Sequence, residues 1–143
     1  MTVLVDTGVL YADHDVDATR HEVAHDALEA VYDGEFGLPY VSDYVYDEVV
    51  TLTLTRGGSF AAAKRLGERL RGADPFPQTY EMLRVSAAVF ADAVEIFERY
   101  DDQALSFTDA TTVALYERHD VDHVLSFDDD FDGLVSRLDP VTV

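Results

Sequence analysis

Short apolar runs alternate along the chain with longer segments in which apolar residues recur every three or four positions. The first run, Thr2–Val5, consists only of apolar and β-branched residues and is followed at once by Asp6. A run of this kind is typical of a strand that is buried on both faces of a parallel sheet. Similar runs predict three further strands and a candidate edge strand: Phe36–Val41, Tyr80–Val85, His123–Phe127 and Val141–Val143.

The segments between these runs have the spacing of amphipathic helices. Val23, Ala27 and Val31 share one face of the first predicted helix, which Gly34 ends. The later helices begin at residues whose hydroxyls can cap a helix N-terminus, namely Ser42, Ser59, Ser86 and either Ser106 or Thr108. In the helix after Ser86, the apolar positions are Val89, Phe90, Ala93, Val94 and Phe97.

This alternation of strands and helices predicts an α/β fold with a central, mostly parallel β-sheet flanked by helices on both faces. A chain of 143 residues is long enough for one such core, so we expect a single domain over residues 1–143. Ligands bind open sheets beyond the carboxyl ends of the strands, where helix N-termini also point. We therefore expect the functional residues at that edge.

Composition excludes several kinds of site. The chain has no cysteine, which excludes disulfides and thiolate metal sites. The first strand begins without a basic leader, and no apolar run approaches the ~20 residues that a membrane span needs. We therefore expect a cytoplasmic protein that does not act in a membrane.

The chain is strongly acidic, with 29 acidic residues against 10 basic ones and a net charge of −19. Lys64 is the only lysine. This combination favours a halophilic protein, because a high-salt cytoplasm screens the self-repulsion of so many charges. A well-solubilised acidic protein is the plainer interpretation. The charge would ordinarily oppose binding to nucleic acid, but salt screening weakens that objection.

Four carboxylates come from well-separated segments. Asp6 and Asp128 follow strands, Glu48 lies on a helix, and Asp109 lies in the first turn of another helix. Carboxylates gathered in one cleft repel one another unless a cation neutralises them or one keeps a proton. Mg²⁺ and Mn²⁺ prefer such ligands together with water and phosphate oxygens. Each carboxylate alone could be a helix cap or a surface charge, but Asp6 interrupts a buried run, where a charge is costly.

Four segments, in this order, look like the motifs of PIN-domain proteins: Val3–Leu10, Asp47–Val49, Leu105–Ala110 and Ser126–Phe131. Their order and spacing resemble those of the small VapC-type toxin ribonucleases across nearly the whole chain. Thr7 matches the hydroxyl that usually follows the first aspartate of this family. Ser126 stands where threonine is common, a departure that keeps the hydroxyl.

The resemblance implies a metal-dependent endoribonuclease, the toxin of a type II toxin–antitoxin pair, with Mg²⁺ or Mn²⁺ as cofactor. The acidic positions of the family correspond here to Asp6, Glu48, Asp109 and Asp128, with Asp130 more peripheral. Asp6 and Asp109 are expected to hold the metal directly. Glu48 and Asp128 are expected to act through coordinated water or a second ion.

The resemblance also implies partners: an RNA substrate, an antitoxin and a second copy of the chain in a homodimer. An arginine or lysine of the antitoxin would pair with the cleft carboxylates. The helices between Ser42 and Arg71 would supply a groove, unless their apolar residues only complete the core; the candidates are Val45, Val49, Leu52 and Phe60. No motif specifies the RNA target or its cleavage site.

Half of the basic residues fall within Arg56–Arg71. They form either a solvated helix face or a positive strip that guides RNA or an acidic segment of the antitoxin. Nearby tyrosines could stack on bases, although aromatic residues at helical spacing more often belong to the core; they are Tyr40, Tyr44 and Tyr46.

Four other functions compete with a metal-dependent nuclease. A catalytically silent PIN-like module that only binds RNA or protein would not need the complete acidic set. The segment His21–His25 matches the H-E-x-x-H motif of zinc proteases, but its extended form fails because Leu28 and Val31 replace the glycine and the third histidine. Haloacid-dehalogenase phosphatases and receiver domains need a lysine near the phosphoryl group, and Lys64 lies in a mid-chain helix.

Overall fold

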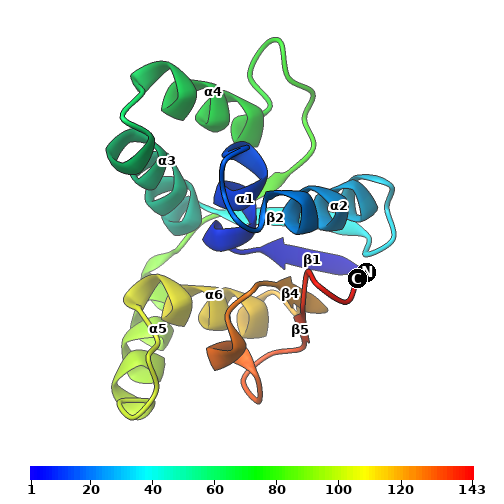
Figure 1. Cartoon of the computed structure of the whole chain (residues 1–143). Coiled ribbons are helices and arrows are strands. Elements are labelled where there is room, and N and C mark those ends of the chain that lie inside the picture. The colour runs from blue at the N-terminus through cyan, green and yellow to red at the C-terminus, as the bar shows by residue number, and fades with distance from the viewer.

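The computed structural model describes residues 1–143 and is organised around a five-stranded sheet (Figure 1). The order across the sheet is β3-β2-β1-β4-β5, and every neighbouring pair is parallel. This confirms the predicted α/β fold with a parallel sheet. The strands are β1 (Thr2–Val5), β2 (Leu38–Ser42), β3 (Glu81–Leu83), β4 (His123–Leu125) and β5 (Arg137–Leu138).

Strand β1 occupies the middle of the sheet, where Leu4 is in register with Tyr40 of β2 and Val124 of β4. Val3, Leu4 and Val5 are fully buried, as the unbroken apolar run predicts. Successive side chains of a strand point to opposite faces. Val3 and Val5 therefore belong to one core cluster and Leu4 to the other.

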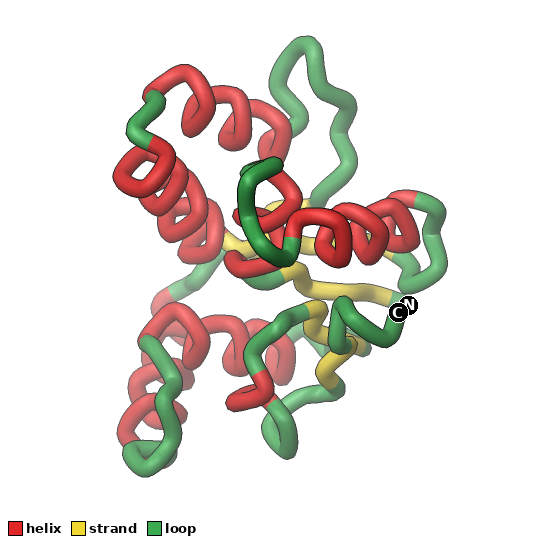
Figure 2. Tube along the Cα trace, in the orientation of Figure 1, coloured by secondary structure: helices red, strands yellow, loops and turns green.

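Six helices cover the two faces of the sheet, so that strands form the middle layer between two helical layers (Figures 1 and 2). Residues of α1 to α4 pack in the cluster of Val3 and Val5, whereas α5 and α6 pack in the cluster of Leu4. None of the helices has the length and hydrophobicity that a membrane span requires. The helices are α1 (Thr7–His14), α2 (His21–Tyr32), α3 (Asp43–Gly57), α4 (Phe60–Arg71), α5 (Ala87–Arg99) and α6 (Phe107–Arg118).

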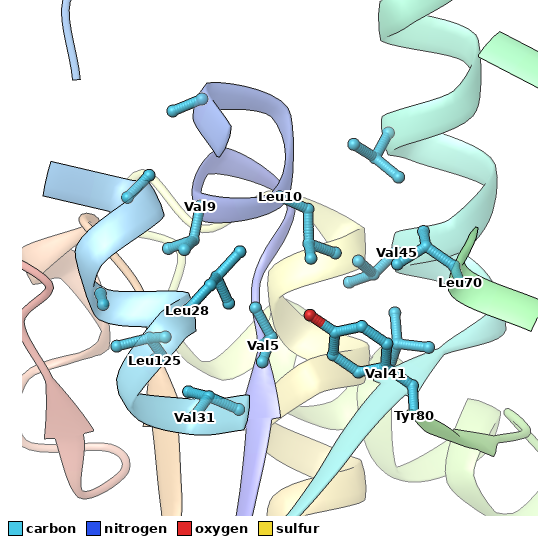
Figure 3. Packing of buried hydrophobic residues seen from close by; sticks show 14 of the residues in the cluster. Val5, Val9, Leu10, Leu28, Val31, Val41, Val45, Leu70, Tyr80 and Leu125 are labelled. Carbon is cyan, nitrogen blue, oxygen red and sulfur yellow. The ribbon is translucent and has the colours of Figure 1, made fainter. Parts of the chain in front are cut away.

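The larger core cluster contains two residues that the sequence also allows as groove residues. Val45 and Val49 of α3 are fully buried in this cluster, where Figure 3 shows Val45 among the other apolar side chains. The prediction that they contact an antitoxin is therefore wrong, because their surface is already covered by the core. Of the other two candidates, Leu52 is partly buried and Phe60 is 71% exposed.

The chain has one helix that its pattern does not predict. Thr7 and Gly8 indicate a turn after β1, but α1 begins directly at Thr7. Glycine disfavours a helix by about 1 kcal/mol, and the burial of Val9 and Leu10 outweighs this cost. Asp6 occupies the N-cap position of α1, yet its side chain makes no capping hydrogen bond. That carboxylate is therefore available for another role.

The predicted edge strand at Val141–Val143 is wrong. The edge of the sheet is β5, which pairs with β4. The final residues form a turn instead, in which the amide of Val141 donates to Asp139 Oδ1 (3.0 Å) and the amide of Thr142 to the carbonyl of Asp139 (2.9 Å). Pro140 has no amide hydrogen with which to extend a ladder.

Helix α5 is correctly predicted, but its apolar face is narrower than its sequence suggests. Val89 and Ala93 are buried, whereas Phe90 and Phe97 are 46% and 45% exposed. The rings of both phenylalanines lie against Phe107 of α6, with centroids 5.3 and 5.9 Å apart. Helices α5 and α6 are thus joined by an aromatic cluster at the surface.

Candidate active site

A cavity of about 600 Å³ opens beyond the carboxyl ends of β1 and β4. These strands are adjacent and parallel, so the residues that follow them, Asp6 and Ser126, lie at the same edge of the sheet. All four carboxylates expected from the sequence line this cavity, whereas Asp130 does not. The lining residues are Asp6, Thr7, Gly8, Arg20, Glu48, Ser106, Asp109, Ser126, Phe127, Asp128 and Asp129.

Ser126 connects two of these carboxylates. Its buried hydroxyl donates a hydrogen bond of 2.7 Å to Asp6 Oδ2 and accepts one of 3.0 Å from the amide of Asp128. The hydroxyl therefore fixes the end of β1 against the loop that follows β4. A threonine hydroxyl at this position could make the same two bonds.

Asp109 is held by the N-terminus of α6. Its amide donates to the hydroxyl of Ser106, and Asp109 Oδ2 in turn accepts from the amide of Ser106, both at 3.0 Å. This reciprocal pair is a capping box, which satisfies two amides that the first turn of a helix leaves free. Oδ1 of Asp109 makes no hydrogen bond in the structure, and the residue lines the cavity.

Glu48 reaches the cavity from α3. This helix follows β2, which lies beside β1, and the Ser42 hydroxyl caps its start by accepting from the amide of Val45 (3.0 Å). The helix therefore begins at the same edge of the sheet as the other carboxylates. Glu48 is partly buried near this end of α3.

A second acidic group lies in one turn after β4. Carboxylate oxygens of Asp128, Asp129 and Asp130 lie within 4.8 Å of one another. Their closeness follows largely from the turn itself, because the amide of Asp130 donates to Asp128 Oδ1 (2.9 Å). The carboxylates of Asp6 and Asp109, by contrast, are brought to the cavity by elements far apart in the sequence. We regard that wider set as the better candidate for a functional site.

Burial and mutual repulsion shift two carboxyl pKa values upward. The pKa of Asp6 is raised to about 7, chiefly by burial and in addition by the charges of Asp109 and Glu48, whereas the hydrogen bond from Ser126 opposes the rise. Burial also raises the pKa of Asp109 to about 6, opposed by the hydrogen bond from the amide of Ser106 and reinforced by Asp128 and Glu48. The cavity thus gathers more negative charge than Arg20, its one basic lining residue, can neutralise.

The donor set fits a divalent cation with oxygen ligands. Hard cations such as Mg²⁺ bind a few carboxylates and retain several waters, which suits carboxylates spread around an open cavity. Thr7 adds a further observation, because its buried Oγ1 has no hydrogen-bond partner although the residue lines the cavity beside Asp6. Orphaned hydroxyls of this kind indicate a missing polar partner.

The model of one protein family, the PIN domain, matches residues 3–135. The chain belongs to the PIN domain family. The match includes all four carboxylates and ends at Val135, two residues before β5.

Proteins similar to this PIN domain include named toxins and ribonucleases. The chain is 29% identical over 126 residues to Ribonuclease VapC26 of Mycobacterium tuberculosis, which covers 88% of this chain and 86% of that protein. It is 26% identical to the crystal structure of VapC20 from the same organism, a Sarcin-Ricin loop cleaving toxin, with a TM-score of 0.76 and coverage of 90% and 92%. VapBC2 of Rickettsia felis, at 9% identity, shares the fold, with a TM-score of 0.71 and coverage of 96% and 98%.

Sequence reasoning misses one residue of the PIN domain's cavity. Arg20 lines the wall, and its guanidinium carbon lies 4.6 Å from the centroid of the Phe127 ring. Arg20 precedes α2 at the end of an acidic loop, and no spacing or pattern in the sequence connects it to the carboxylates. Only the packing of this loop against Phe127, in the segment that follows β4, brings Arg20 there.

The geometry argues against the zinc-protease interpretation. His21 Nδ1 lies 2.9 Å from the carbonyl of Ala12, and His25 Nδ1 lies 3.0 Å from Asp13 Oδ1. Both histidines line a separate cavity that also contains two guanidinium groups, those of Arg65 and Arg69. The two guanidinium groups offset the charges of Asp13 and Glu29, which line the same cavity, and so weaken its attraction for a cation. Glu48, a downstream glutamate that could complete such a zinc site, lines the other cavity.

The basic stretch of the PIN domain is partly paired within the chain. Lys64 lies 3.8 Å from Glu68, and Arg69 lies 3.9 Å from Asp13. A role for this stretch in guiding RNA or an antitoxin stays a prediction. The three candidate stacking tyrosines are all partly buried: Tyr40, Tyr44 and Tyr46.

Proposed function

We propose that this PIN domain is a metal-dependent endoribonuclease and the toxin of a type II toxin–antitoxin pair, acting on cytoplasmic RNA. The observation that carries the proposal is the convergence of Asp6, Glu48, Asp109 and Asp128 on one cavity from four separate parts of the chain. A fold that only bound a partner would have no need to gather carboxylates in one cavity, since their mutual repulsion destabilises it.

The similar proteins support the choice of substrate. VapC26 is named a ribonuclease, and VapC20 is described as a toxin that cleaves the sarcin–ricin loop. We infer that this chain also cleaves RNA. The RNA sequence that it recognises depends on the shape of the cavity rim, which no sequence motif specifies.

Asp6 and Asp109 are the residues proposed to hold Mg²⁺ or Mn²⁺. Burial raises the pKa values of these two carboxyl groups, to about 7 for Asp6 and about 6 for Asp109. Each carboxylate uses only its Oδ2 atom in the hydrogen bond with Ser126 or Ser106, so its other oxygen is free to bind a cation. A bound divalent cation supplies a Lewis acid that lowers the pKa of water and offsets the charge that grows on the phosphate.

The remaining residues orient water and substrate. Glu48 and Asp128 flank the cavity and are the carboxylates available to accept hydrogen bonds from an attacking water and to take its proton. Ser126 keeps Asp6 and the backbone of Asp128 in a fixed relation. Because water is the nucleophile, the products should carry a 5′-phosphate and a 3′-hydroxyl.

We propose an antitoxin as the protein partner and a homodimer as the assembly. Solved structures of the same fold include a toxin–antitoxin complex from Klebsiella pneumoniae, at 19% identity with a TM-score of 0.65. Exposed apolar side chains on α3 and α4, Leu54 and Phe60, offer a surface for such a partner. Tagged protein from its native cells should therefore co-purify with a small basic-tailed companion. Recovery of a lone monomer would contradict the toxin–antitoxin assignment while leaving the nuclease intact.

Metal binding distinguishes the nuclease from a catalytically silent module. In high KCl, Mn²⁺ should raise the melting temperature of the wild-type protein, because a ligand that binds only the folded state stabilises it. Asp109→Asn should lose this shift. Asp102→Asn removes an exposed acid between α5 and α6 and should keep it. A wild-type protein that Mn²⁺ does not stabilise would favour the silent module.

A further inference from the structure

The acidic cavity contains a single cationic side chain. Of the residues that line it, five are acidic and only Arg20 is basic. A nuclease must bring the polyanionic backbone of RNA into this cavity. Five carboxylates repel a phosphate even when a divalent cation neutralises part of their charge, so a fixed positive group on the wall changes what the cavity can bind.

Arg20 is held at the wall by an aromatic ring. Its guanidinium carbon lies 4.6 Å from the centroid of Phe127, the one apolar residue of the lining. Contact with the ring face stabilises a guanidinium without using any of its N–H donors. Phe127 in turn lies beside Gly8 at the start of α1, where a Cβ atom would be 4.0 Å from the ring. The ring therefore joins the loop of Arg20 to the part of the wall that carries Asp6.

The guanidinium makes no ion pair and no side-chain hydrogen bond in the structure, although carboxylates line the same cavity. Arg118 and Arg137, by contrast, are each paired with a carboxylate: Arg118 with Asp92 at 2.9 Å and Arg137 with Asp132 at 2.7 Å. The N–H donors of Arg20 are thus free for an anion that enters the cavity. A planar guanidinium matches two oxygens of a phosphate, which a lysine ammonium does not.

We propose that Arg20 binds a backbone phosphate of the RNA in the acidic cavity, with Phe127 as the residue that positions it. This inference rests on the proposed function, because it assigns the substrate contact of the same site. The carboxylates and their cation would act at the scissile bond, while Arg20 binds a backbone phosphate of the RNA at the wall of the cavity.

Steady-state cleavage kinetics test the contact between Arg20 and the RNA phosphate. Arg20→Gln should raise KM for a short single-stranded RNA by about tenfold and change kcat by less than about twofold, because a charge-assisted contact is lost from substrate binding. Arg99→Gln is a matched control: Arg99 is also exposed and also lies over an aromatic ring, that of Tyr100 at 6.0 Å, but it does not line the cavity. It should leave KM unchanged.

Direct measurement of RNA binding separates the contribution of Arg20 to substrate affinity from any effect on the cleavage step. In an Asp6→Asn background that retains the RNA, a fluorescent RNA oligonucleotide should bind about tenfold more weakly when Arg20→Gln is added. The slope of log Kd against log salt should fall by ~0.7, the value for one phosphate contact of a single strand. Arg20→Lys should recover only part of the affinity, because lysine restores the charge but lacks the planar guanidinium that can donate two parallel hydrogen bonds to a phosphate.

The positioning role of Phe127 has its own readout. Phe127→Leu should raise KM by less than Arg20→Gln, and it should add nothing to KM in the double variant, because the ring acts through the guanidinium. Fully additive effects would contradict the positioning role. Melting temperatures of Arg20→Gln and Arg99→Gln should match that of the wild type, since both side chains are exposed.

Two results would overturn the assignment of Arg20 while the wild type still cleaves RNA. One is an Arg20→Gln variant whose KM and Kd equal those of Arg99→Gln. The other is a fall in kcat with KM and Kd unchanged, which would mean that Arg20 acts on the catalytic carboxylates and not on RNA binding. A wild-type protein that neither binds nor cleaves RNA would instead contradict the proposed function itself, and the assignment of Arg20 with it.

Discussion

At the scale of single residues, the site depends on carboxylates that are held where their charge is unfavourable. Asp6 is only 8% exposed, yet it receives one side-chain hydrogen bond, from Ser126 at 2.7 Å. Repulsion from Asp109 and Glu48 adds to the effect of burial, so the pKa of Asp6 rises to about 7. The charged Asp6 carboxylate therefore destabilises the folded protein, and a bound cation would offset this destabilisation.

Asp6→Asn should stabilise the protein in the absence of divalent cations. The pKa of Asp6 is about 7 in the folded state against 3.8 as the ordinary value, so the folded state binds more protons between these pH values. The free energy of unfolding of the wild type consequently falls as pH rises through this interval. Asn keeps the acceptor for Ser126 without the charge. Since Asp6 faces an open cavity, we expect a gain on the order of 2 kcal/mol at pH 8 and less than half of that gain at pH 5.

Urea unfolding of both proteins at the two pH values, in EDTA, measures this difference. Asp102→Asn is the control, because an exposed carboxylate should give the same small effect at each pH. A gain from Asp6→Asn that is equal at pH 5 and pH 8 would show that Asp6 has no raised pKa.

At the scale of elements, helix starts and strand ends account for the position of each carboxylate. Ser42 and Ser106 cap α3 and α6, the helices that carry Glu48 and Asp109. The cap of α6 affects the position of the site carboxylate more directly than the cap of α3 does, because Asp109 is itself part of the capping box. The helix start is thus both a structural feature and a part of the site.

Ser106→Ala should cost about 1 kcal/mol of stability through the lost cap. Ser86→Ala is the matched control, since Ser86 caps α5 in the same way by accepting from the amide of Val89 (3.2 Å) and lies away from the cavity. Both variants should lose similar stability in urea unfolding. Only Ser106→Ala should also reduce kcat/KM for RNA, because it loosens Asp109. Equal activities of the two variants would contradict a link between the cap and the site.

The same elements show what sequence could and could not predict. Apolar runs identify β1, β2, β3 and β4, and serine caps identify α3 to α6, because these signals are local. Helix α1 escapes detection, since Gly8 weakens the helix locally and burial of Val9 and Leu10 decides its formation. Arg20 escapes for a related reason: its place at the cavity depends on contact with Phe127, over a hundred residues away in the chain. The four carboxylates were recognisable because each belongs to a short motif.

At the scale of the whole molecule, the net charge of −19 is the dominant property. Like charges on a compact protein repel one another and favour unfolding unless salt screens them. The Debye length falls from about 10 Å at 0.1 M to about 3 Å at 1 M salt. The acidic surface therefore predicts a protein whose stability depends on salt.

The melting temperature should rise steadily with KCl between about 0.1 M and about 2 M if the chain is adapted to high salt. Differential scanning fluorimetry with EDTA present measures this without any contribution from divalent cations. Sucrose at matched viscosity serves as the uncharged control. A melting temperature that is constant across the KCl series would favour the plainer interpretation of a well-solubilised acidic protein.

The most direct test of the account is cleavage of RNA by the purified protein. With Mn²⁺, the wild type should cleave a long RNA into fragments that carry 5′-phosphate and 3′-hydroxyl ends, and EDTA should abolish the reaction. Asp6→Asn should cleave at least about 100-fold more slowly, because it removes a charge that the reaction requires. Cleavage by Asp6→Asn at the wild-type rate, or fragments with 5′-hydroxyl ends, would contradict the assignment of the acidic cavity as a metal-dependent nuclease site.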